Sequence, residues 1–172
     1  MKVILEGPDG VGKSTLAEYL CNHHGLEVKH SSGETKNDLQ YHFELINDDN
    51  ICLDRANLGE IVYPIIYDRQ AKMNWADQIT FMNKCAEENI IYIIFYASNF
   101  EDLKKRLFSR GDTEQVLNNA EKINFSFIFL AKMFSEIYEN VYALDISKES
   151  DQIYAFEKFI DEYEKELNNE SK

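Results

Sequence analysis

The chain has 172 residues, of which 44% are hydrophobic and 28% are charged, and its formal net charge is −13 at pH 7. A length of 172 residues predicts a single domain over residues 1–172. The strong negative charge disfavours binding to a polyanion such as nucleic acid, and no apolar run approaches the length of a membrane span. Small mobile anions suffer less from this field, so we expect small-molecule partners and no membrane contact. The three cysteines are widely spaced, without a disulfide or zinc-ligand pattern, which fits a cytoplasmic protein.

Strands and helices alternate along the whole chain. The apolar segment Lys2–Glu6 predicts a buried strand, and Ser14–His24 predicts a helix that ends at Gly25. Such alternation is typical of a parallel sheet with helices on both faces, so we predict an α/β three-layer sandwich with a five-stranded sheet. The other strands are predicted at Leu26–His30, Ile51–Leu53, Ile90–Tyr96 and Val141–Leu144, and the other helices at Glu34–Ile46, Asn57–Tyr67 (kinked or broken at Pro64), Trp75–Glu88, Phe100–Ser109, Glu114–Tyr138 (one helix or two) and Ile153–Leu167.

The stretch between the first strand and the first helix, Gly7–Ser14, has the spacing G-x-x-x-x-G-K-S of a phosphate-binding loop, or P-loop. Glycines allow backbone N–H groups to form a concave anion site, and the next helix adds the positive end of its dipole. Lys13 would contact the outer phosphates of a nucleoside triphosphate, and Ser14 would bind Mg²⁺. The predicted ATP-binding residues are Gly7, Asp9, Gly10, Val11, Gly12, Lys13, Ser14 and Thr15.

A second candidate group, Asp54-Arg55, follows a short predicted strand. In open α/β sheets, ligands bind beyond the carboxyl ends of the strands, which would place this pair beside the P-loop. Asp54 would then bind Mg²⁺ together with Ser14, and Arg55 would bind a phosphate in bidentate fashion. The alternative is an ion pair on the surface at the end of a strand.

Four basic residues gather near the end of the helix predicted before Gly111. Arg106 and Arg110 are four residues apart, so one helical face presents both. The alternative is that cations at a helix C-terminus stabilise the helix dipole, and Lys104 and Lys105 fit this alternative. The predicted catalytic residues are Lys13, Asp54, Arg55, Arg106 and Arg110.

Two stretches resemble one enzyme family. Gly7–Thr15 resembles the opening loop of thymidylate kinases, and the run Asp54–Tyr63 resembles the region around the D-R motif in compact, phage-type members. The resemblance implies a P-loop NTPase-type fold, with ATP and Mg²⁺ as cofactors. The arginines after the strongest strand resemble the helical lid of nucleoside monophosphate kinases, which would lie at approximately 104–120 here.

The resemblance also implies an acceptor site. Asp9 would contact the sugar hydroxyl of the acceptor nucleotide and Arg55 the phosphates in transit; from the residues alone, Asp9 could equally form an Asx-turn. Tyr63 is a candidate for stacking on the base. Arg69 is a candidate for binding the acceptor phosphate, or a solvated surface residue. The stretch Lys29–Thr35 departs from the Pro-Gly-Gly-Thr segment of larger thymidylate kinases, so the residues that recognise the base are not carried over.

We therefore predict ATP-dependent phosphoryl transfer to a deoxynucleoside monophosphate, with dTMP as the first choice. One alternative is a kinase that acts on a deoxynucleoside or on a hydroxymethylated base in DNA, and another is a P-loop regulator without an acceptor. Such a switch would be expected to read guanine through an N-K-x-D motif, which Asn83-Lys84-Cys85-Ala86 lacks. The broad apolar stripe of the helix Glu114–Tyr138, which Phe125 and Phe129 widen, predicts core packing and leaves a homodimer contact open.

Overall fold

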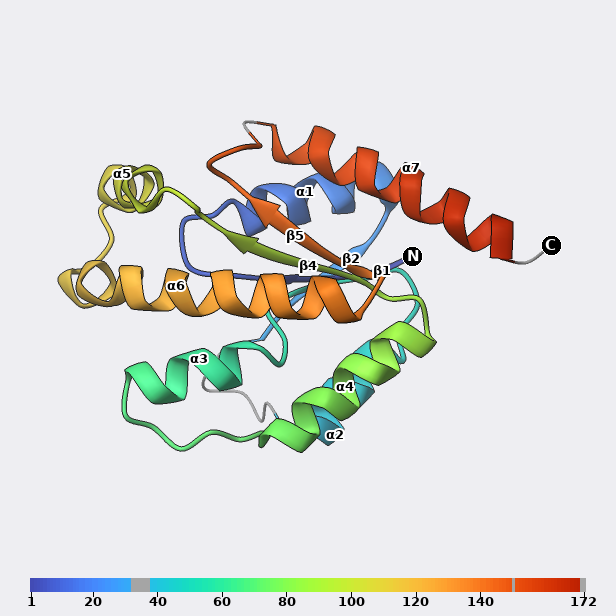
Figure 1. Cartoon of the computed structure of the whole chain (residues 1–172), viewed down its shortest axis with the longest axis horizontal. Helices are drawn as coiled ribbons and strands as arrows, with labels where there is room; N and C mark the ends of the chain where they lie inside the picture. The colour runs from blue at the N-terminus through green and yellow to red at the C-terminus, as the bar shows by residue number, and fades with distance from the viewer. Residues whose placement is uncertain (32–37, 150, 171–172) are drawn as a thin grey trace.

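The computed structural model of the chain describes residues 1–31, 38–149 and 151–170. Within them lies one parallel sheet whose strand order is β2-β3-β1-β4-β5 (Figure 1). The two strands that flank β1 come from different halves of the chain, so loops from both halves meet at its carboxyl end. The predicted five-stranded parallel sheet is therefore confirmed. The strands are β1 (Lys2–Glu6), β2 (Glu27–His30), β3 (Ile51–Asp54), β4 (Ile91–Tyr96) and β5 (Val141–Asp145).

Helices cover both faces of the sheet, which confirms the three-layer arrangement. One apolar core joins the sheet to α1, α5 and α7, and a second joins it to α2, α3, α4 and α6. In Figure 1, α1 and α7 lie above the sheet, and α6, α3 and α4 lie below it. None of the described helices is long and apolar enough to cross a membrane. The helices are α1 (Lys13–His24), α2 (Leu39–Ile46), α3 (Gly59–Ile66), α4 (Trp75–Glu87), α5 (Phe100–Arg110), α6 (Glu114–Ile137) and α7 (Gln152–Glu170).

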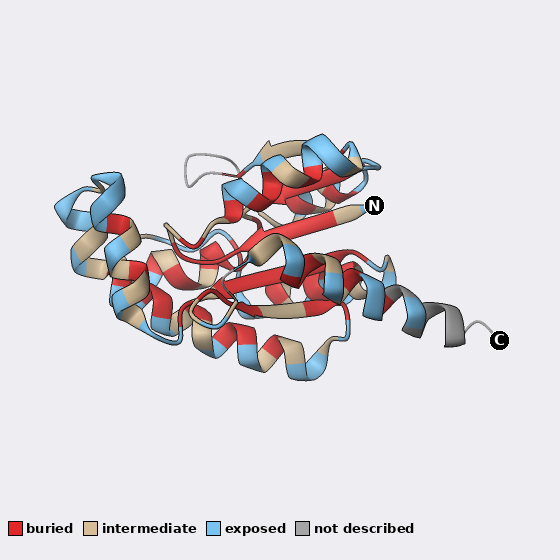
Figure 2. Ribbon diagram, turned by 90° about the horizontal axis from the view of Figure 1, so that it is seen from above, coloured by how far each residue is buried: buried red, intermediate tan, exposed pale blue. Residues whose placement is uncertain are grey.

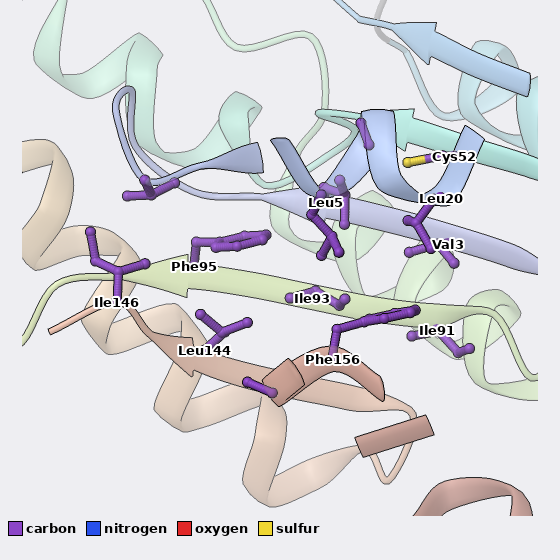
Figure 3. Packing of buried hydrophobic residues seen from close by; sticks show 14 of the residues in the cluster. Val3, Leu5, Leu20, Cys52, Ile91, Ile93, Phe95, Leu144, Ile146 and Phe156 are labelled. Atoms are coloured by element: carbon purple, nitrogen blue, oxygen red, sulfur yellow. The ribbon is translucent and has the colours of Figure 1, made fainter. Parts of the chain in front are cut away.

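The two cores follow from the two-residue period of the strands. In β1, Val3 and Leu5 belong to the core on the α1 and α7 side, whereas Ile4 belongs to the opposite core. Figure 3 shows Val3 and Leu5 packed near Phe95 of β4 and Phe156 of α7. Burying each such side chain contributes roughly 1.5–3 kcal/mol to the free energy of unfolding. Figure 2 shows the result: except for the edge strand β2, which has no buried residue, the strands are buried along most of their length, and exposed residues lie on the outer sides of the helices.

Two helices differ from the expectation. Pro64 neither ends nor breaks α3, which continues to Ile66; the missing N–H affects only one bond near the end of a short helix. The next backbone N–H groups still find carbonyls, because Tyr67 N donates to Tyr63 O at 2.9 Å. The helix predicted from Glu34 begins at Leu39, because Asp38 is its extended N-cap residue and accepts a hydrogen bond from Tyr41 N at 2.9 Å; residues 34–37 lie outside the described part. The predicted segment Glu114–Tyr138 forms a single helix, α6.

Candidate nucleotide-binding site

The P-loop connects β1 to α1 and requires glycine at two tightly packed positions. Gly7 has φ 144°, and a Cβ there would lie 2.7 Å from the carbonyl oxygen of Phe95. Gly12 has φ 98° and immediately precedes α1, where a Cβ would lie 2.1 Å from Oε1 of Gln152. The positive φ disfavours L side chains at both positions. At Gly7 the backbone of Phe95 excludes a Cβ a second time, whereas at Gly12 the close neighbour is the end of the flexible Gln152 side chain. The loop is therefore fixed by its backbone, next to the N-terminus of a helix that attracts anions.

Lys13 is buried within this loop. Its Nζ donates to the carbonyl oxygens of Gly7 at 2.9 Å and Pro8 at 2.7 Å. Burial, followed by the neighbouring charge of Arg55, lowers the pKa of Lys13 from 10.5 to about 8. A buried ammonium with a lowered pKa gains most from an added negative charge, so this group is suited to bind phosphate oxygens.

The Asp54-Arg55 pair lies beside the loop, as the sequence predicts. Arg55 takes a left-handed conformation at φ 74°, and its backbone N donates to Leu5 O at 2.9 Å. Its guanidinium forms an ion pair with Asp9 and lies 5.7 Å from the ring centroid of Tyr63. This turn brings the D-R pair onto the end of β1 and fixes the direction of the arginine.

Sequence reasoning missed Glu6, whose side chain accepts hydrogen bonds from the backbone of the turn after Arg55. Glu6 is fully buried, and its Oε1 accepts hydrogen bonds from the backbone N of Ala56 at 2.9 Å, Leu58 at 2.8 Å and Gly59 at 3.4 Å. Burial raises the pKa of Glu6 above its usual value, although the backbone bonds and the charge of Lys13 oppose the shift. The sequence signal that could have identified Glu6 is a single acidic residue at the end of an otherwise apolar strand.

Gln152 is a second residue that was missed. It is the first residue of α7, and its Nε2 donates to Val11 O at 2.8 Å, which joins the P-loop to a helix 141 residues further along the chain. An isolated glutamine gives no sign of such a contact, because only the fold brings the two segments together.

A pocket of about 610 Å³ opens between the P-loop, the D-R turn and α5. Its volume lies within the range of small-molecule sites, roughly 300–1,000 Å³. Among the described residues that line it, four carry positive charge and two carry negative charge. Figure 1 shows α5 at the same end of the sheet as the loop after β1. The lining residues are Asp9, Gly10, Gly12, Lys13, Ser14, Thr15, Asp54, Arg55, Arg106, Ser109 and Arg110.

Four of the predicted residues do not line this pocket. Gly7 and Val11 act through their carbonyls, which accept hydrogen bonds from Lys13 and Gln152. Tyr63 packs beside Arg55, and burial raises the pKa of its hydroxyl. Arg69 forms an ion pair with the buried Glu60 at 3.0 Å. Arg69 would therefore have to exchange this carboxylate for a phosphate if it were to bind an acceptor.

Comparison with known proteins bears on the fold. The chain matches no family model and no curated protein sequence. It is similar to the structure of Bacillus subtilis YorR in complex with phosphorylated GDP (22% identity, 96% of this chain and 98% of that chain, TM-score 0.77). It is also similar to M. mycoides deoxyadenosine kinase with bound dATP (22%, 94% and 100%, TM-score 0.57) and with bound dCTP (21%, 94% and 100%, TM-score 0.57). The chain has a P-loop kinase-like fold.

The donor set in this pocket fits Mg²⁺. Asp54 is buried, its Oδ2 lies 3.0 Å from Nδ1 of His30, and its Oδ1 has no hydrogen-bond partner among the described residues. Ser14 lines the same pocket. Mg²⁺ typically binds one or two protein oxygens and completes its coordination with substrate phosphates and water. A buried carboxylate oxygen with free acceptor capacity beside a P-loop serine matches that requirement.

Proposed function

We propose that this protein transfers a phosphoryl group from ATP to a deoxynucleoside monophosphate, with dTMP as the first expected acceptor. The observation that carries the proposal is the convergence of four cations from three parts of the chain on one pocket. Lys13 comes from the P-loop, Arg55 from the turn after β3, and Arg106 and Arg110 from α5. A single triphosphate typically meets a P-loop lysine and one arginine finger, so the additional cations favour a second phosphorylated substrate facing the first.

The residues would work by position and charge. ATP would lie with its phosphates on the P-loop, where Lys13 exchanges its bonds to the loop carbonyls for phosphate oxygens. Mg²⁺, bound by Asp54 and Ser14, would neutralise charge on the phosphates. Arg106 and Arg110 would approach the phosphoryl group from the opposite side. Pre-placed charges of this kind stabilise a transition state without the reorganisation that water needs.

The Asp9–Arg55 pair supports a phosphorylated acceptor. The guanidinium lies between the carboxylate of Asp9 and the ring of Tyr63, so its direction is set before any substrate binds. Arg55 would bind the acceptor phosphate, and Asp9 would accept a hydrogen bond from the sugar hydroxyl. A phosphate acceptor is already ionised at neutral pH, so no strong base is required.

A second candidate is a deoxynucleoside kinase. The similarity in fold to M. mycoides deoxyadenosine kinase favours it, as does Oδ1 of Asp54, which has no hydrogen-bond partner in the part of the chain that the structure describes. A neutral hydroxyl acceptor needs a general base, and Asp54 is the buried carboxylate in the pocket that would serve.

An acceptor panel distinguishes these functions. The protein is incubated with Mg²⁺ and ATP plus, separately, dTMP, dUMP, dAMP, dGMP, dCMP, thymidine, deoxyadenosine and hydroxymethylated DNA, and products are identified by mass. We expect dTDP from dTMP and no product from the nucleosides. Product from thymidine or deoxyadenosine but from none of the monophosphates would establish the second candidate. Nucleotide binding without any transfer would indicate a regulator.

A further inference from the structure

His30 ends strand β2 and lies next to Asp54, which ends β3. The two residues are partners in the register of these parallel strands, and Ser31 N donates to Asp54 O at 3.2 Å. Paired residues of neighbouring strands project from the same face of a sheet, so the fold places the imidazole beside the carboxylate. Nδ1 of His30 lies 3.0 Å from Oδ2 of Asp54. The contact therefore follows from the strand pairing.

This contact makes the two oxygens of the Asp54 carboxylate unequal. Oδ2 faces the imidazole, whereas Oδ1 is buried and has no hydrogen-bond partner among the described residues. The side chain of Asp54 is 8% exposed and that of His30 is 66% exposed, so the imidazole contacts an enclosed carboxylate from the solvent side. The terminal torsion of an aspartate side chain is broad, so an unrestrained carboxylate samples many orientations. A neighbour in contact with one oxygen restricts this rotation and keeps the other oxygen in one direction.

His30 itself stands outside the pocket between the P-loop and α5, because the described residues that line this pocket do not include it. It borders a separate hollow of about 290 Å³ beside α1 and β2. Ser14 lines both the pocket and the hollow. The imidazole thus reaches the pocket through its contact with Asp54, and we expect its effect on a bound nucleotide to pass through that carboxylate.

We propose that His30 is a positioning residue that holds Oδ2 of Asp54 and keeps Oδ1 available to the Mg²⁺ of bound Mg·ATP. This role rests on the proposed function, in which Asp54 and Ser14 bind the ion. In the tautomer that carries its proton on Nδ1, the imidazole donates to a carboxylate oxygen. Carboxylates that bind metals are commonly hydrogen-bonded in turn, and loss of the outer partner typically lowers metal affinity or activity about 10–100-fold.

The alternative role of His30 is to stabilise the end of β3 without any part in binding. A polar pair with one exposed partner contributes little to the free energy of unfolding. A structural role would weaken nucleotide binding equally with and without Mg²⁺, whereas a positioning role acts only when the ion is present. The ratio of the two affinities therefore distinguishes the two roles.

The test measures equilibrium binding of a non-hydrolysable ATP analogue by calorimetry, once in excess MgCl₂ and once in EDTA, without an acceptor. The ratio of the two dissociation constants is the Mg²⁺-dependent gain in affinity. We expect His30→Ala to reduce this gain about 10-fold or more and to leave the dissociation constant in EDTA nearly unchanged. His30→Asn should keep most of the gain, because Nδ2 of asparagine is also a donor and lies as many bonds from the backbone as Nδ1 of histidine.

A double-mutant cycle shows whether His30 acts through Asp54. Asp54→Asn removes the charge that attracts the ion and should abolish the gain, and adding His30→Ala should then change nothing further. His23→Ala is the matched control, because His23 is an exposed histidine on α1 whose Nδ1 lies 3.1 Å from Tyr19 O. This variant should bind the analogue as the unmodified protein does. Circular dichroism checks that every variant is folded.

Several outcomes would overturn the proposal: an unchanged gain in His30→Ala, an equal loss in EDTA and in MgCl₂, a His30→Asn variant as impaired as His30→Ala, or a gain that survives Asp54→Asn. An unmodified protein that gains no affinity from Mg²⁺ would overturn it together with the metal role of Asp54 in the proposed function. If the acceptor panel failed while the gain persisted and depended on His30, the proposed acceptor would be rejected and the role of His30 would stand.

Discussion

The two sides of the pocket between the P-loop and α5 are built in different ways. On the side of β1, Lys13 and Asp54 are buried, and the loop around them is fixed by glycine conformations and by hydrogen bonds to the backbone. On the side of α5, Arg106 is half-buried and Arg110 is exposed. Arg110 has Asp112, two residues further on, as its ion-pair partner at 3.1 Å. The β1 side is therefore a fixed loop with buried charges, and the α5 side consists of long side chains that are half-buried or exposed.

This difference suggests that the two sides contribute unequally to lowering the barrier of the proposed reaction. Buried charges in a fixed backbone act with little screening and need no reorganisation, so each should contribute a large share of the barrier reduction. Exposed arginines are screened by water until a substrate covers them, so each should contribute less. Mutations on the two sides should therefore differ in size, and the predictions below test this order.

The largest effect is expected for Lys13→Ala. The change removes the buried cation of the loop, so kcat should fall by roughly 10²–10³-fold, as for the loss of a preorganised donor. Steady-state kinetics with ATP and the acceptor found in the panel would measure it. Thermal unfolding is the control, and no loss of stability is expected, because burying an ammonium costs free energy. A turnover within tenfold of the unmodified protein would refute the role of Lys13.

A smaller effect is expected for Arg106→Ala and Arg110→Ala. Each should lower kcat by roughly 10–100-fold, less than Lys13→Ala, because water screens these more exposed side chains. Lys104→Ala and Lys105→Ala are matched controls, since both lysines lie on α5 but do not line the pocket. If the lysine variants lost as much activity as the arginine variants, the basic cluster would act through helix stability rather than through the phosphates.

The same contrast explains what could be predicted from the sequence. The P-loop is a local motif whose glycine spacing determines its conformation, so a loop at Gly7–Ser14 between the first strand and the first helix could be predicted. The five-stranded parallel sheet followed from alternating strands and helices, whereas its strand order did not. Glu6 and Gln152 could not be assigned, because their roles depend on contacts with backbone atoms far away in the chain. The partner of Arg69 was missed for the same reason, since its ion pair with Glu60 depends on how α3 ends.

Glu6 allows a further test of the β1 side of the pocket, through the pH dependence of kcat/KM for ATP. The charge of Glu6 raises the pKa of Lys13, against burial, which lowers it to about 8. Lys13 loses its proton above that pKa, so kcat/KM for ATP should decline as pH rises above about 8. Glu6→Gln removes the negative charge and should move this decline to lower pH. The shift should be less than about one unit, because close opposite charges produce about one to three units and Glu6 is the weakest charge acting on Lys13.

Glutamine suits this test because its oxygen still accepts hydrogen bonds from the turn after Arg55. Thermal unfolding at pH 7 should therefore show a folded protein with stability close to that of the unmodified chain. An unchanged pH profile in a folded Glu6→Gln variant would show that Glu6 supports the turn without affecting the charge of Lys13.

The smallest effect is expected for Gln152→Ala. It removes one hydrogen bond to Val11 O, which is worth about 0.5–1.5 kcal/mol, so KM for ATP should rise roughly 2–10-fold with little change in kcat. Gln40→Ala, at an exposed position of α2, is the control.

Gly12→Ala separates the two reasons for glycine in the loop. If the clash with Gln152 dominates, adding Gln152→Ala should restore much of the activity, whereas strain at φ 98° would leave the double variant as impaired as Gly12→Ala.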